Sequence, residues 1–273
     1  MHEAGPGHAP RRDVQSVIRI DDPNATELEP YTKIRERDLF GRERLFVAEG
    51  EVVVRVLAER SKRRVRSFLI EERRVEAMQD VIERADAPAY VVPQAVMNTV
   101  VGFDIHRGVL AIGERGPELA AADLLRHARI AVGLVGLTNH DNVGGIFRSA
   151  AAFAADAVLL DAETCDPLYR KAIRVSAGAA LVLPFARVAH AFDLIDQARA
   201  AGLEPIALSP RGETELTALP PGRYALLLGT EGPGLPDEVM DRVRRVRIDM
   251  PGKLDSLNVG VAGAIALHHV TRR

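Results

Sequence analysis

The pattern of apolar and polar positions divides the chain into an irregular start and two regions where short apolar runs alternate with helical patterns. In the first region, runs rich in β-branched and aromatic residues predict strands at 45–48, 65–70, 89–92 and 109–112. Apolar residues at helical spacing predict helices between them at 51–59 and 75–85. This alternation predicts a small α/β unit that ends near Gly113.

The second region has longer and more continuous apolar runs. The run at 130–135 is typical of a strand buried on both faces of a parallel sheet. Further strands are predicted at 157–160, 183–188, 205–208, 225–228 and 244–248, and helices at 146–155, 167–180, 191–201 and 237–243. Such alternation predicts a parallel α/β sheet with helices on both faces. Ligands of these sheets bind beyond the carboxyl ends of strands, which directs attention to the loops after Val135, Leu208, Leu228 and Ile248.

These patterns define the predicted domain organisation. Residues 1–16 are rich in Gly, Pro and His and lack periodicity, which predicts a disordered tail. Residues 17–113 are predicted to form the first α/β domain, and 114–127 a linker with Gly, Pro and an Ala run. Residues 128–273 are predicted to form the larger, parallel-sheet domain.

Composition excludes several classes of protein. With 273 residues and 47% hydrophobic content, the chain can bury a sizeable core. No apolar run approaches the roughly 20 residues of a membrane span, and the first residues lack the apolar segment of a signal peptide. We therefore expect a cytoplasmic protein without membrane association. The lone cysteine, Cys165, excludes an internal disulfide and a cysteine-based zinc site, and we expect no metal.

The net charge of −2 does not by itself indicate a polyanionic partner, so any nucleic-acid surface must be local. The sharpest basic cluster is the segment 60–66. Such charge can hold phosphates, which makes Lys62, Arg63 and Arg64 candidate RNA contacts. The alternative is a solvated helix end and loop, since acidic residues such as Glu59 dilute the field.

The loop after the first strand of the second region reads Asn139-x-x-Asn142-x-Gly144-x-x-x-Arg148. Asn142 is predicted at or just before a helix N-terminus, a common cap position, with Arg148 further along a similar face. Gly144 and Gly145 each cost roughly 1 kcal/mol relative to alanine within a helix. We therefore expect a ligand or a neighbouring chain to approach this bare backbone closely. A capped helix with a solvent-facing arginine would explain Asn142 but not the paired glycines.

Two later loops also have unusual sequences. The strand that ends at Leu228 is followed by Gly-Thr-Glu-Gly-Pro-Gly-Leu, a tight turn that fixes Glu231. This loop is neither a Gly-x-x-x-x-Gly-Lys-Ser/Thr loop nor a Gly-x-Gly-x-x-Gly fingerprint, which disfavours nucleotide-binding enzymes of those kinds. The segment 247–261 turns through a Pro-Gly pair into an Ala- and Gly-rich helix whose first turn is expected to hold Ser256 and Asn258.

In order and spacing, these stretches resemble the three signature motifs of the SpoU family, the TrmH-type RNA ribose 2′-O-methyltransferases of the SPOUT superfamily. The resemblance covers roughly residues 128–270. Thr230 stands where the family commonly has Asn, Ala or Ser, and Gly260 where Ser is common. The first domain, 17–113, is similar to the L30e-type substrate-binding domain that many members carry.

The resemblance implies a catalytic domain whose C-terminal segment is threaded into a deep trefoil knot. It also implies S-adenosylmethionine as methyl donor, held at the positions of Leu208, Gly229, Ile248 and Leu257. Members of the family work as homodimers in which the active site is completed across the interface. Small residues along the last predicted helix fit such close packing.

By the same resemblance, Arg148 is the main catalytic residue, and Asn142, Glu231, Ser256 and Asn258 position substrate and donor. Asn139 and Arg148, with the basic cluster, are expected to contact the RNA. A guanidinium is effectively always protonated, so we expect Arg148 to bind phosphate and stabilise the developing alkoxide, with the proton passing to phosphate or water.

Ribosomal RNA is the favoured substrate and transfer RNA the second, because an added domain is useful for reading RNA shape away from the reacting ribose. One alternative is a non-catalytic RNA-binding member of the fold. Another is an enzyme that methylates a base or a small molecule. The intact motif residues argue against the first alternative; they are Asn142, Arg148, Glu231, Ser256 and Asn258. The Asn–Arg pair of the first motif points to the 2′-hydroxyl and argues against the second.

Overall fold

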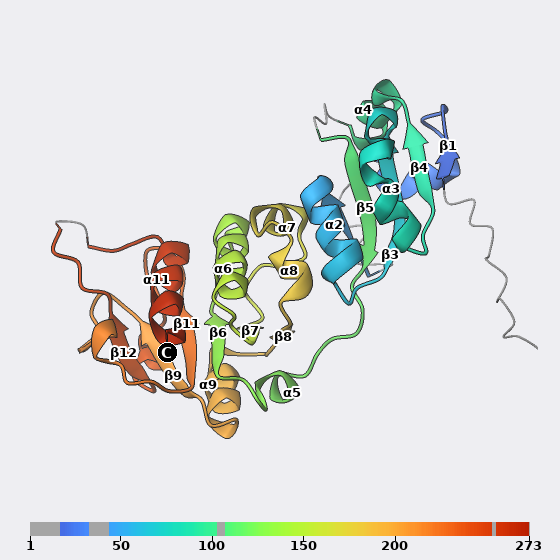
Figure 1. The fold of residues 1–273 in the computed structure, drawn as a ribbon. Helices are drawn as coiled ribbons and strands as arrows, with labels where there is room; N and C mark the ends of the chain where they lie inside the picture. Colours follow the sequence, from blue (N-terminus) through green and yellow to red (C-terminus); the bar gives the residue numbers. More distant parts are fainter. Residues whose placement is uncertain (1–16, 33–43, 103–106, 253–254, 273) are drawn as a thin grey trace, which may run out of the picture.

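The computed structural model describes residues 17–32, 44–102, 107–252 and 255–272. The tail expected at 1–16 lies outside these residues. Two β-sheets, one in each half of the chain, lie side by side with helices packed on them (Figure 1).

The first domain contains a five-stranded mixed sheet with the order β1-β4-β3-β5-β2. β4 is parallel to β1 and β3, whereas β5 is antiparallel to β3 and β2. The elements are β1 (Val17–Arg19), β2 (Leu45–Glu49), α2 (Glu51–Arg60), β3 (Val65–Glu71), α3 (Val75–Arg84), β4 (Ala89–Val92), α4 (Gln94–Val101) and β5 (Val109–Glu114), with 3₁₀ helices at Thr26–Tyr31 and Glu72–Arg74. The predicted strands and helices of this region are confirmed within two residues, whereas β1 and α4 were not predicted.

Both faces of this sheet are covered. Phe46 and Ala48 of β2 pack into a cluster with α2 and α3, while Leu45 and Val47 pack on the other face with α4 and the Thr26–Tyr31 helix. Successive side chains of a strand point to opposite faces, so a strand buried on both faces has no polar positions between its apolar ones. This explains the continuous apolar run of β2.

The second domain contains a seven-stranded sheet with the order β10-β12-β9-β11-β6-β7-β8. Every pair of neighbouring strands is parallel, which confirms the predicted parallel α/β sheet. The elements are α5 (Ala121–Leu125), β6 (Ile130–Leu134), α6 (His140–Ala152), β7 (Ala157–Leu160), α7 (Arg170–Val175), α8 (Ala179–Val182), β8 (Phe185–Arg187), α9 (Ala191–Ala200), β9 (Glu204–Leu208), β10 (Thr214–Glu215), β11 (Tyr224–Leu228), α10 (Asp237–Met240), β12 (Arg244–Arg247) and α11 (Val259–Thr271), with a 3₁₀ helix at Leu216–Ala218.

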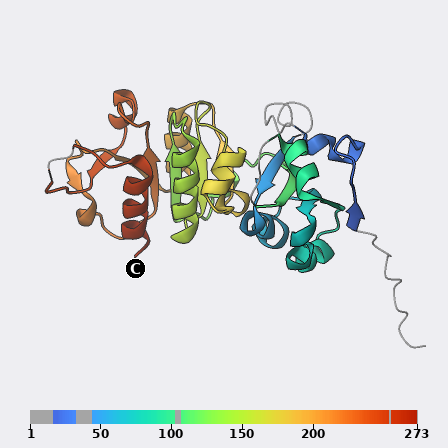
Figure 2. The same cartoon turned by 90° about the horizontal axis from the view of Figure 1, so that it is seen from above.

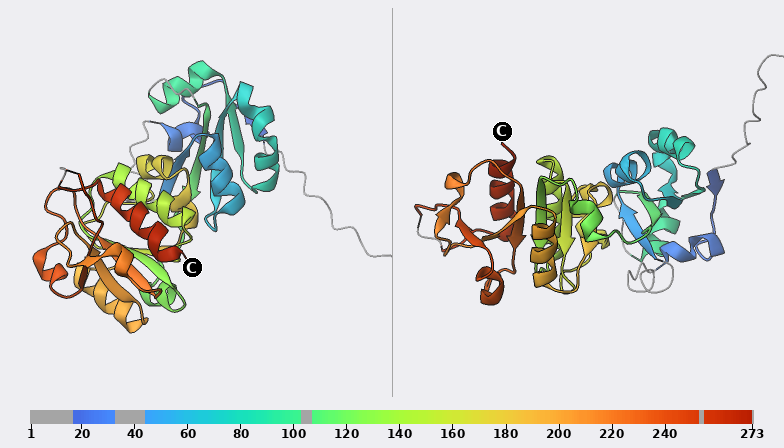
Figure 3. Two further views of the ribbon diagram at one scale, coloured as in Figure 1. Left: turned by 60° about the vertical axis from the view of Figure 1, so that its left-hand side comes forward. Right: turned by 90° about the horizontal axis from the view of Figure 1, so that it is seen from below.

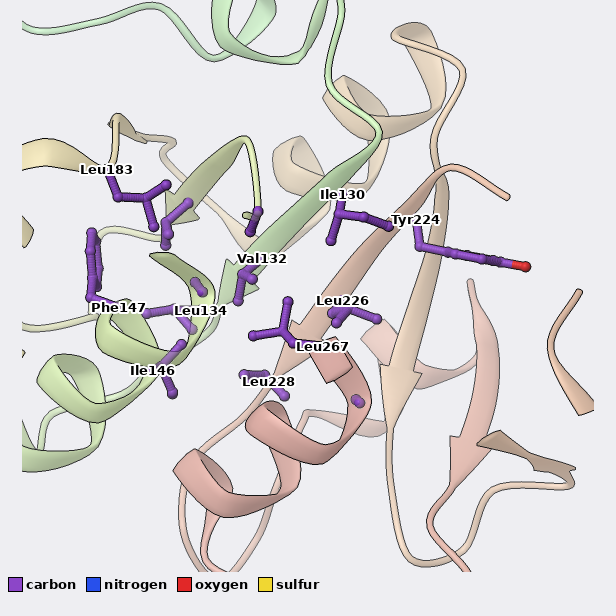
Figure 4. Close-up of a cluster of buried hydrophobic side chains, with 14 of the residues drawn as sticks. Ile130, Val132, Leu134, Ile146, Phe147, Leu183, Tyr224, Leu226, Leu228 and Leu267 are labelled. Atoms are coloured by element: carbon purple, nitrogen blue, oxygen red, sulfur yellow. The ribbon is translucent and has the colours of Figure 1, made fainter. Parts of the chain in front are cut away.

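The two central strands of this sheet, β6 and β11, carry its core (Figure 4). On one face, Val132 and Leu226 join Ile146 and Phe147 of α6 and Leu267 of α11 in one apolar cluster. On the other face, alternate residues of the same strands pack with α5, α9 and α10. Helices α6 and α11 therefore lie side by side on the first face (Figure 2).

Several boundaries differ from the prediction. The helix predicted at 237–243 ends at Met240, and the strand predicted at 183–188 spans Phe185–Arg187. The helix predicted at 146–155 begins at His140 and ends at Ala152. The helix predicted at 167–180 is two short helices, because Ala177 and Gly178 between them have left-handed φ values of 51° and 84°. The predicted linker 114–127 was expected to lead into a short helix; this helix is α5, and its Leu125 is fully buried in the core of the second domain.

An apolar cluster joins the two domains through α7 and α8, which lie between the large sheet and the first domain (Figure 3). Leu168, Ile173 and Leu181 of the second domain belong to the cluster that α2 and α3 form on the first sheet. The hydroxyl of Ser61 also donates a hydrogen bond to the carbonyl oxygen of Leu181 (2.8 Å). The domains thus share a core, and removing the first one would expose apolar side chains of the second.

The helices of the described residues include none that is both long and apolar enough to cross a membrane.

Candidate functional site

A cavity of about 600 Å³ lies at the carboxyl edge of the large sheet, where the loops after β9, β11 and β12 meet the start of α11. Its volume is in the range of small-molecule sites. The residues predicted to hold the donor, Leu208, Gly229, Ile248 and Leu257, all line this cavity. Glu231, Ser256 and Asn258 line it as well. The structure thus brings together residues that are far apart in the sequence.

The loop after β11 is closed on itself. The backbones of Thr230 and Gly234 exchange two hydrogen bonds of 3.2 Å each, and the Thr230 hydroxyl donates a third to the Gly234 carbonyl oxygen (3.1 Å). A Cβ at Gly229 would lie 2.4 Å from the carbonyl carbon of Gly234, so only glycine fits there. This closed turn presents backbone groups to the cavity and holds Glu231 at its edge.

Asn258 connects the three motifs. Its Nδ2 donates hydrogen bonds to Asn142 Oδ1 (3.0 Å) and to Glu231 Oε1 (2.7 Å). Its Oδ1 accepts from the backbone N–H groups of Gly260 (2.9 Å) and Val261 (3.3 Å), which caps α11. One amide therefore fixes the start of α11, the β11 loop and the first turn of α6 relative to one another.

The cap positions differ from the sequence prediction. α6 is capped by Asn139, whose Oδ1 accepts from the Asp141 N–H (2.8 Å), whereas Asn142 lies inside the first turn with 8% of its surface exposed. Asn142 was expected at the cap, but the helix starts earlier and turns this side chain toward α11. Ser256 precedes α11 and is exposed, so it is not in the first turn as expected.

Arg148 does not line the cavity. It lies on the exposed face of α6 and makes no hydrogen bond or ion pair with any other residue that the structure describes. The paired glycines next to it have different environments. A Cβ at Gly144 would lie 2.7 Å from the carbonyl oxygen of Ala172, so this glycine lets α7 pack on α6. A Cβ at Gly145 would meet nothing within 4 Å, which leaves this part of the helix open to approach from outside.

The basic cluster at 60–66 is not a uniform surface. Lys62 and Arg64 are exposed. The guanidinium of Arg63 instead lies over the ring of Phe185, 5.4 Å from its centroid, and donates a hydrogen bond to the Arg115 carbonyl oxygen. Burial, with smaller contributions from the charge of Arg115 (lowering) and Asp166 (raising), brings the Arg63 pKa to about 10. Arg63 therefore contributes to the joint between the domains.

Two cavity residues, Ser209 and Arg211, did not figure in the sequence prediction. Arg211 is exposed, and its guanidinium lies 3.6 Å from the Asp237 carboxylate. Both residues lie in the loop directly after Leu208, which the strand-end rule had already pointed to, so that rule could have identified them.

Cys165 is half-buried, and burial is the main reason that its pKa is raised to about 11. Its thiol is therefore protonated near neutral pH, which does not suit a nucleophile. Within the described ranges, no group of three or more His, Cys, Asp or Glu side chains is placed to hold a metal ion.

The model of the SpoU rRNA Methylase family matches residues 129–268, which contain all three motifs. The protein belongs to this family. A protein of Mycobacterium bovis named "Uncharacterized tRNA/rRNA methyltransferase" is 38% identical over 274 residues, covering 97% of this chain and 94% of its own. A Mycobacterium tuberculosis protein with the same description has the same identity and coverage.

Solved structures of similar proteins have the same fold. The AdoMet-bound rRNA methyltransferase of Sinorhizobium meliloti is 25% identical and aligns with a TM-score of 0.77, over 93% of this SpoU family chain and 97% of its own. The SpoU methyltransferase AviRb of Streptomyces viridochromogenes, 20% identical, aligns with a TM-score of 0.76 over 90% and 95% of the two chains. The similarity extends beyond the motif region, because both alignments include most of the first domain.

Proposed function

We propose that this protein transfers a methyl group from S-adenosylmethionine to a ribose 2′-hydroxyl of RNA. The observation that carries the proposal is the Asn258 amide, which joins the three motifs of the SpoU family at one cavity. A capped helix alone needs only the Oδ1 of such a residue. The two further hydrogen bonds, to Asn142 and Glu231, are not needed for capping, and they hold polar side chains of all three motifs together at the cavity.

The cavity fits the donor in size and in chemistry. Backbone groups of the β11 loop and the apolar side chains of Leu208, Ile248 and Leu257 would hold it. The acceptor oxygens of Glu231 suit its cationic groups. When bound, S-adenosylmethionine supplies an electrophilic methyl group on a sulfonium. A solved SpoU relative from Sinorhizobium meliloti, described as AdoMet-bound, supports this choice of donor.

Methyl transfer from the donor to the ribose asks the side chains around the cavity to bind and align the two reactants, and it asks none of them to form a covalent bond with either. Asn258 holds Asn142 and Glu231 in place, and Ser256 offers a hydroxyl at the rim. Arg148 carries a positive charge that can bind the phosphate next to the reacting ribose and stabilise the alkoxide as the proton leaves. Asn139, exposed at the start of the same helix, is a further candidate for RNA contact.

We propose that a homodimer completes the site, because Arg148 lies outside the cavity of its own chain. An apolar stripe runs from Leu257 at the cavity rim onto α11, where Val261 and Ile265 are exposed; the three side chains are 36%, 50% and 39% exposed. The four-residue spacing of Val261 and Ile265 puts these two on one face of α11. A second copy covering this stripe would bring its own Arg148 toward the cavity, and the open backbone at Gly145 suits such an approach.

A trefoil knot and an L30e-like first domain belong to the same proposal. The order of the large sheet supports the knot, because β12 lies beyond β9 while the following helix α11 returns to pack on β11 and α6. The alternation of helices on both faces of the small mixed sheet is in keeping with an L30e-like domain.

Ribosomal RNA is the substrate we favour, with transfer RNA second. The family description names rRNA, and the name of the Sinorhizobium meliloti structure does so as well. The names of the mycobacterial relatives include both RNAs. A solved structure described as an RNA 2′-O ribose methyltransferase, 25% identical with a TM-score of 0.75, supports the ribose as the reacting group. We place the reaction in the cytoplasm, where a lone reduced cysteine is common.

The test is transfer of labelled methyl from S-adenosylmethionine to separated ribosomal and transfer RNA from a host that lacks this protein. Nucleoside analysis of the product follows. Label in a 2′-O-methyl nucleoside of ribosomal RNA is the expected result. Label in a methylated base would contradict the ribose assignment, and label in transfer RNA alone would contradict the choice of RNA. Donor binding without transfer to either RNA would favour a non-catalytic member of the fold.

A further inference from the structure

A second surface lies outside the cavity lining, where the start of α6 packs on α7 and α7 packs on β2 of the first domain (Figure 1). At its centre the rings of His140 and Tyr169 are in contact, with centroids 4.0 Å apart and planes tilted by 33°. Both side chains are partly exposed. His140 directly follows Asn139 of the first motif.

Basic side chains of α7 flank the two rings. Lys171 pairs with Asp141 (2.6 Å), and Arg170 and Arg174 reach Glu49 of the first domain at 2.7 and 3.7 Å. The side chains of Lys171 and Arg174 remain 46% and 40% exposed, so solvent and ligands can reach them. These three cations face Glu49 and Asp141, and Asp166, whose charge also acts on His140, is paired with Arg115 at 2.6 Å, so cations outnumber carboxylates on this part of the surface.

The first domain adds a further cation. Gly50 follows Glu49 with a φ of 92°, and a Cβ there would lie 3.0 Å from the Cδ of Arg107. The exposed Arg107 therefore lies over the turn that Arg170 holds from the other domain. The positive surface continues across the joint between the domains.

We propose that this surface, formed by His140, Tyr169, Lys171, Arg174 and Arg107 and called the α7 surface below, binds an unpaired RNA segment beside the reacting nucleotide. The inference rests on the proposed function, because it names where the same RNA is held. Unpaired bases stack on aromatic rings, and basic side chains track the backbone. Asp141, which Lys171 contacts, lies about 10 Å along α6 from Arg148, two turns away on the same exposed face. The bound strand therefore runs toward Arg148.

The basic cluster at 60–66 is the rival surface. It lies at the carboxyl end of α2, whereas Gly50 lies at the amino end, about 15 Å away along the helix. The ring of Phe185 beside it is partly exposed, but the Arg63 guanidinium lies over that ring. The cluster therefore offers exposed charge next to a ring that already has a cation on it, and it is the surface to compare with the α7 surface.

The experiment measures binding of a fluorescein-labelled single-stranded 12-nucleotide RNA and of a duplex of equal length to the full chain over a series of salt concentrations. The double variant Lys171→Ala/Arg174→Ala should bind the single strand at least about tenfold more weakly, with a salt slope smaller by roughly 1.4, since each lost phosphate contact in a single strand removes about 0.7. Tyr169→Leu should weaken binding roughly tenfold at every salt concentration and leave the slope unchanged. Lys62→Ala/Arg64→Ala, at the cluster that the sequence predicts as an RNA contact, removes the same number of exposed charges and should weaken single-strand binding less than the α7 variant.

Three results would overturn the proposal. The α7 and 60–66 variants could lose single-strand affinity equally, the 60–66 variant alone could lose it, or the wild type could bind the duplex as tightly as the single strand. Donor binding by calorimetry verifies that each variant is folded. Lys171 and Arg174 are exposed, so the double variant provides the test even where Tyr169→Leu lowers the yield of folded protein. Because the binding assay needs no turnover, absence of methyl transfer in the wild type would contradict the proposed function and leave this inference standing.

Discussion

The two helices at the candidate site begin in the same way and differ in what their first residues do. Asn139 caps α6 and Asn258 caps α11, each through its Oδ1. The Asn139 amide makes no further hydrogen bond within the described part of the chain. The Asn258 amide, by contrast, also donates to Asn142 and Glu231. The same local cap is structural at one helix and the centre of the site at the other, because only α11 begins where three loops converge.

The largest effect is expected from the chemistry that α6 contributes. Arg148→Ala should lower methyl transfer roughly 100- to 1000-fold, as expected for removing a group that stabilises developing charge. The melting temperature should stay unchanged, because the side chain is exposed and makes no hydrogen bond within the described structure. Single-turnover transfer and thermal unfolding measure the two quantities.

Arg126→Ala is the matched control for this variant, because Arg126 is an exposed arginine paired with Asp123 on α5. Its methyl transfer should equal that of the wild type. If Arg148→Ala transferred methyl groups as fast as the wild type, Arg148 would have no role in the reaction. The contribution of α6 would then be limited to the packing and hydrogen bonds of its first turn.

The next effect concerns the bridging amide of α11. Asn258→Asp keeps an oxygen that caps the helix but replaces the Nδ2 donor with a second oxygen next to Glu231. It also leaves the buried Asn142 Oδ1 without its donor, which costs about 1–3 kcal/mol. Urea unfolding measures this loss, and calorimetry should show weaker donor binding.

Asn139→Asp is the corresponding change at α6. It keeps the cap and disturbs no other hydrogen bond of the described structure, so its stability should change by no more than about 1 kcal/mol. Equal losses in Asn258→Asp and Asn139→Asp would mean that the bridge adds nothing to the cap, and the comparison of the two helices would fail.

Removing the α6 cap altogether should have a smaller effect. Asn139→Ala is expected to lower the free energy of unfolding by about 1 kcal/mol, because the Asp141 N–H loses its acceptor. Urea unfolding is the measurement. Asn139→Ser, which can still cap, should recover most of the loss, and a loss of equal size in both variants would contradict the capping role.

The smallest effect is a pH dependence of the free energy of unfolding, which we expect from His140 of α6. Burial, and secondarily the charge of Lys171, lowers the His140 pKa, while Asp166 and Asp141 act in the opposite direction. The folded state then binds a proton less readily than the unfolded state, so stability is present above pH 6.5 and declines as pH falls through the lowered pKa. His140→Gln should show less of this decline, by under about 1 kcal/mol since the ring is partly exposed. An identical decline between pH 7.5 and 5.5 in both proteins would contradict it.

Much of the fold could be predicted because burial leaves a strong pattern. β6 is apolar throughout, since both of its faces are covered. Periodicity placed the start of α6 at Ile146 because glycines count against a helix, whereas the cap argument placed it near Asn142. The helix begins at His140, and Gly144 is required within it by the packing of α7. The break between α7 and α8 was missed because Ala177, a residue that favours helices, has a left-handed φ.

The sequence predicted which loops form the site, because the motifs and strand ends can be located along the chain. It did not predict which side chains meet there, because that depends on the direction of each side chain in the folded protein. The strand-end rule and the motifs pointed to the cavity residues, including Gly229 and Leu257. They did not reveal that Asn258 reaches Asn142, because these residues are 116 positions apart. Nor does a run of basic residues show that Arg63 turns inward onto Phe185 while its neighbours stay in solvent.

The apolar cluster that the two domains share has a consequence for the shape of RNA that fits the protein. Because Leu168, Ile173 and Leu181 are part of the core of the first domain, apolar packing sets the separation of the two sheets. In the proposed reaction, an RNA that contacts the first domain would have to span that separation to reach the cavity. The folded shape of the RNA would then decide whether it is a substrate.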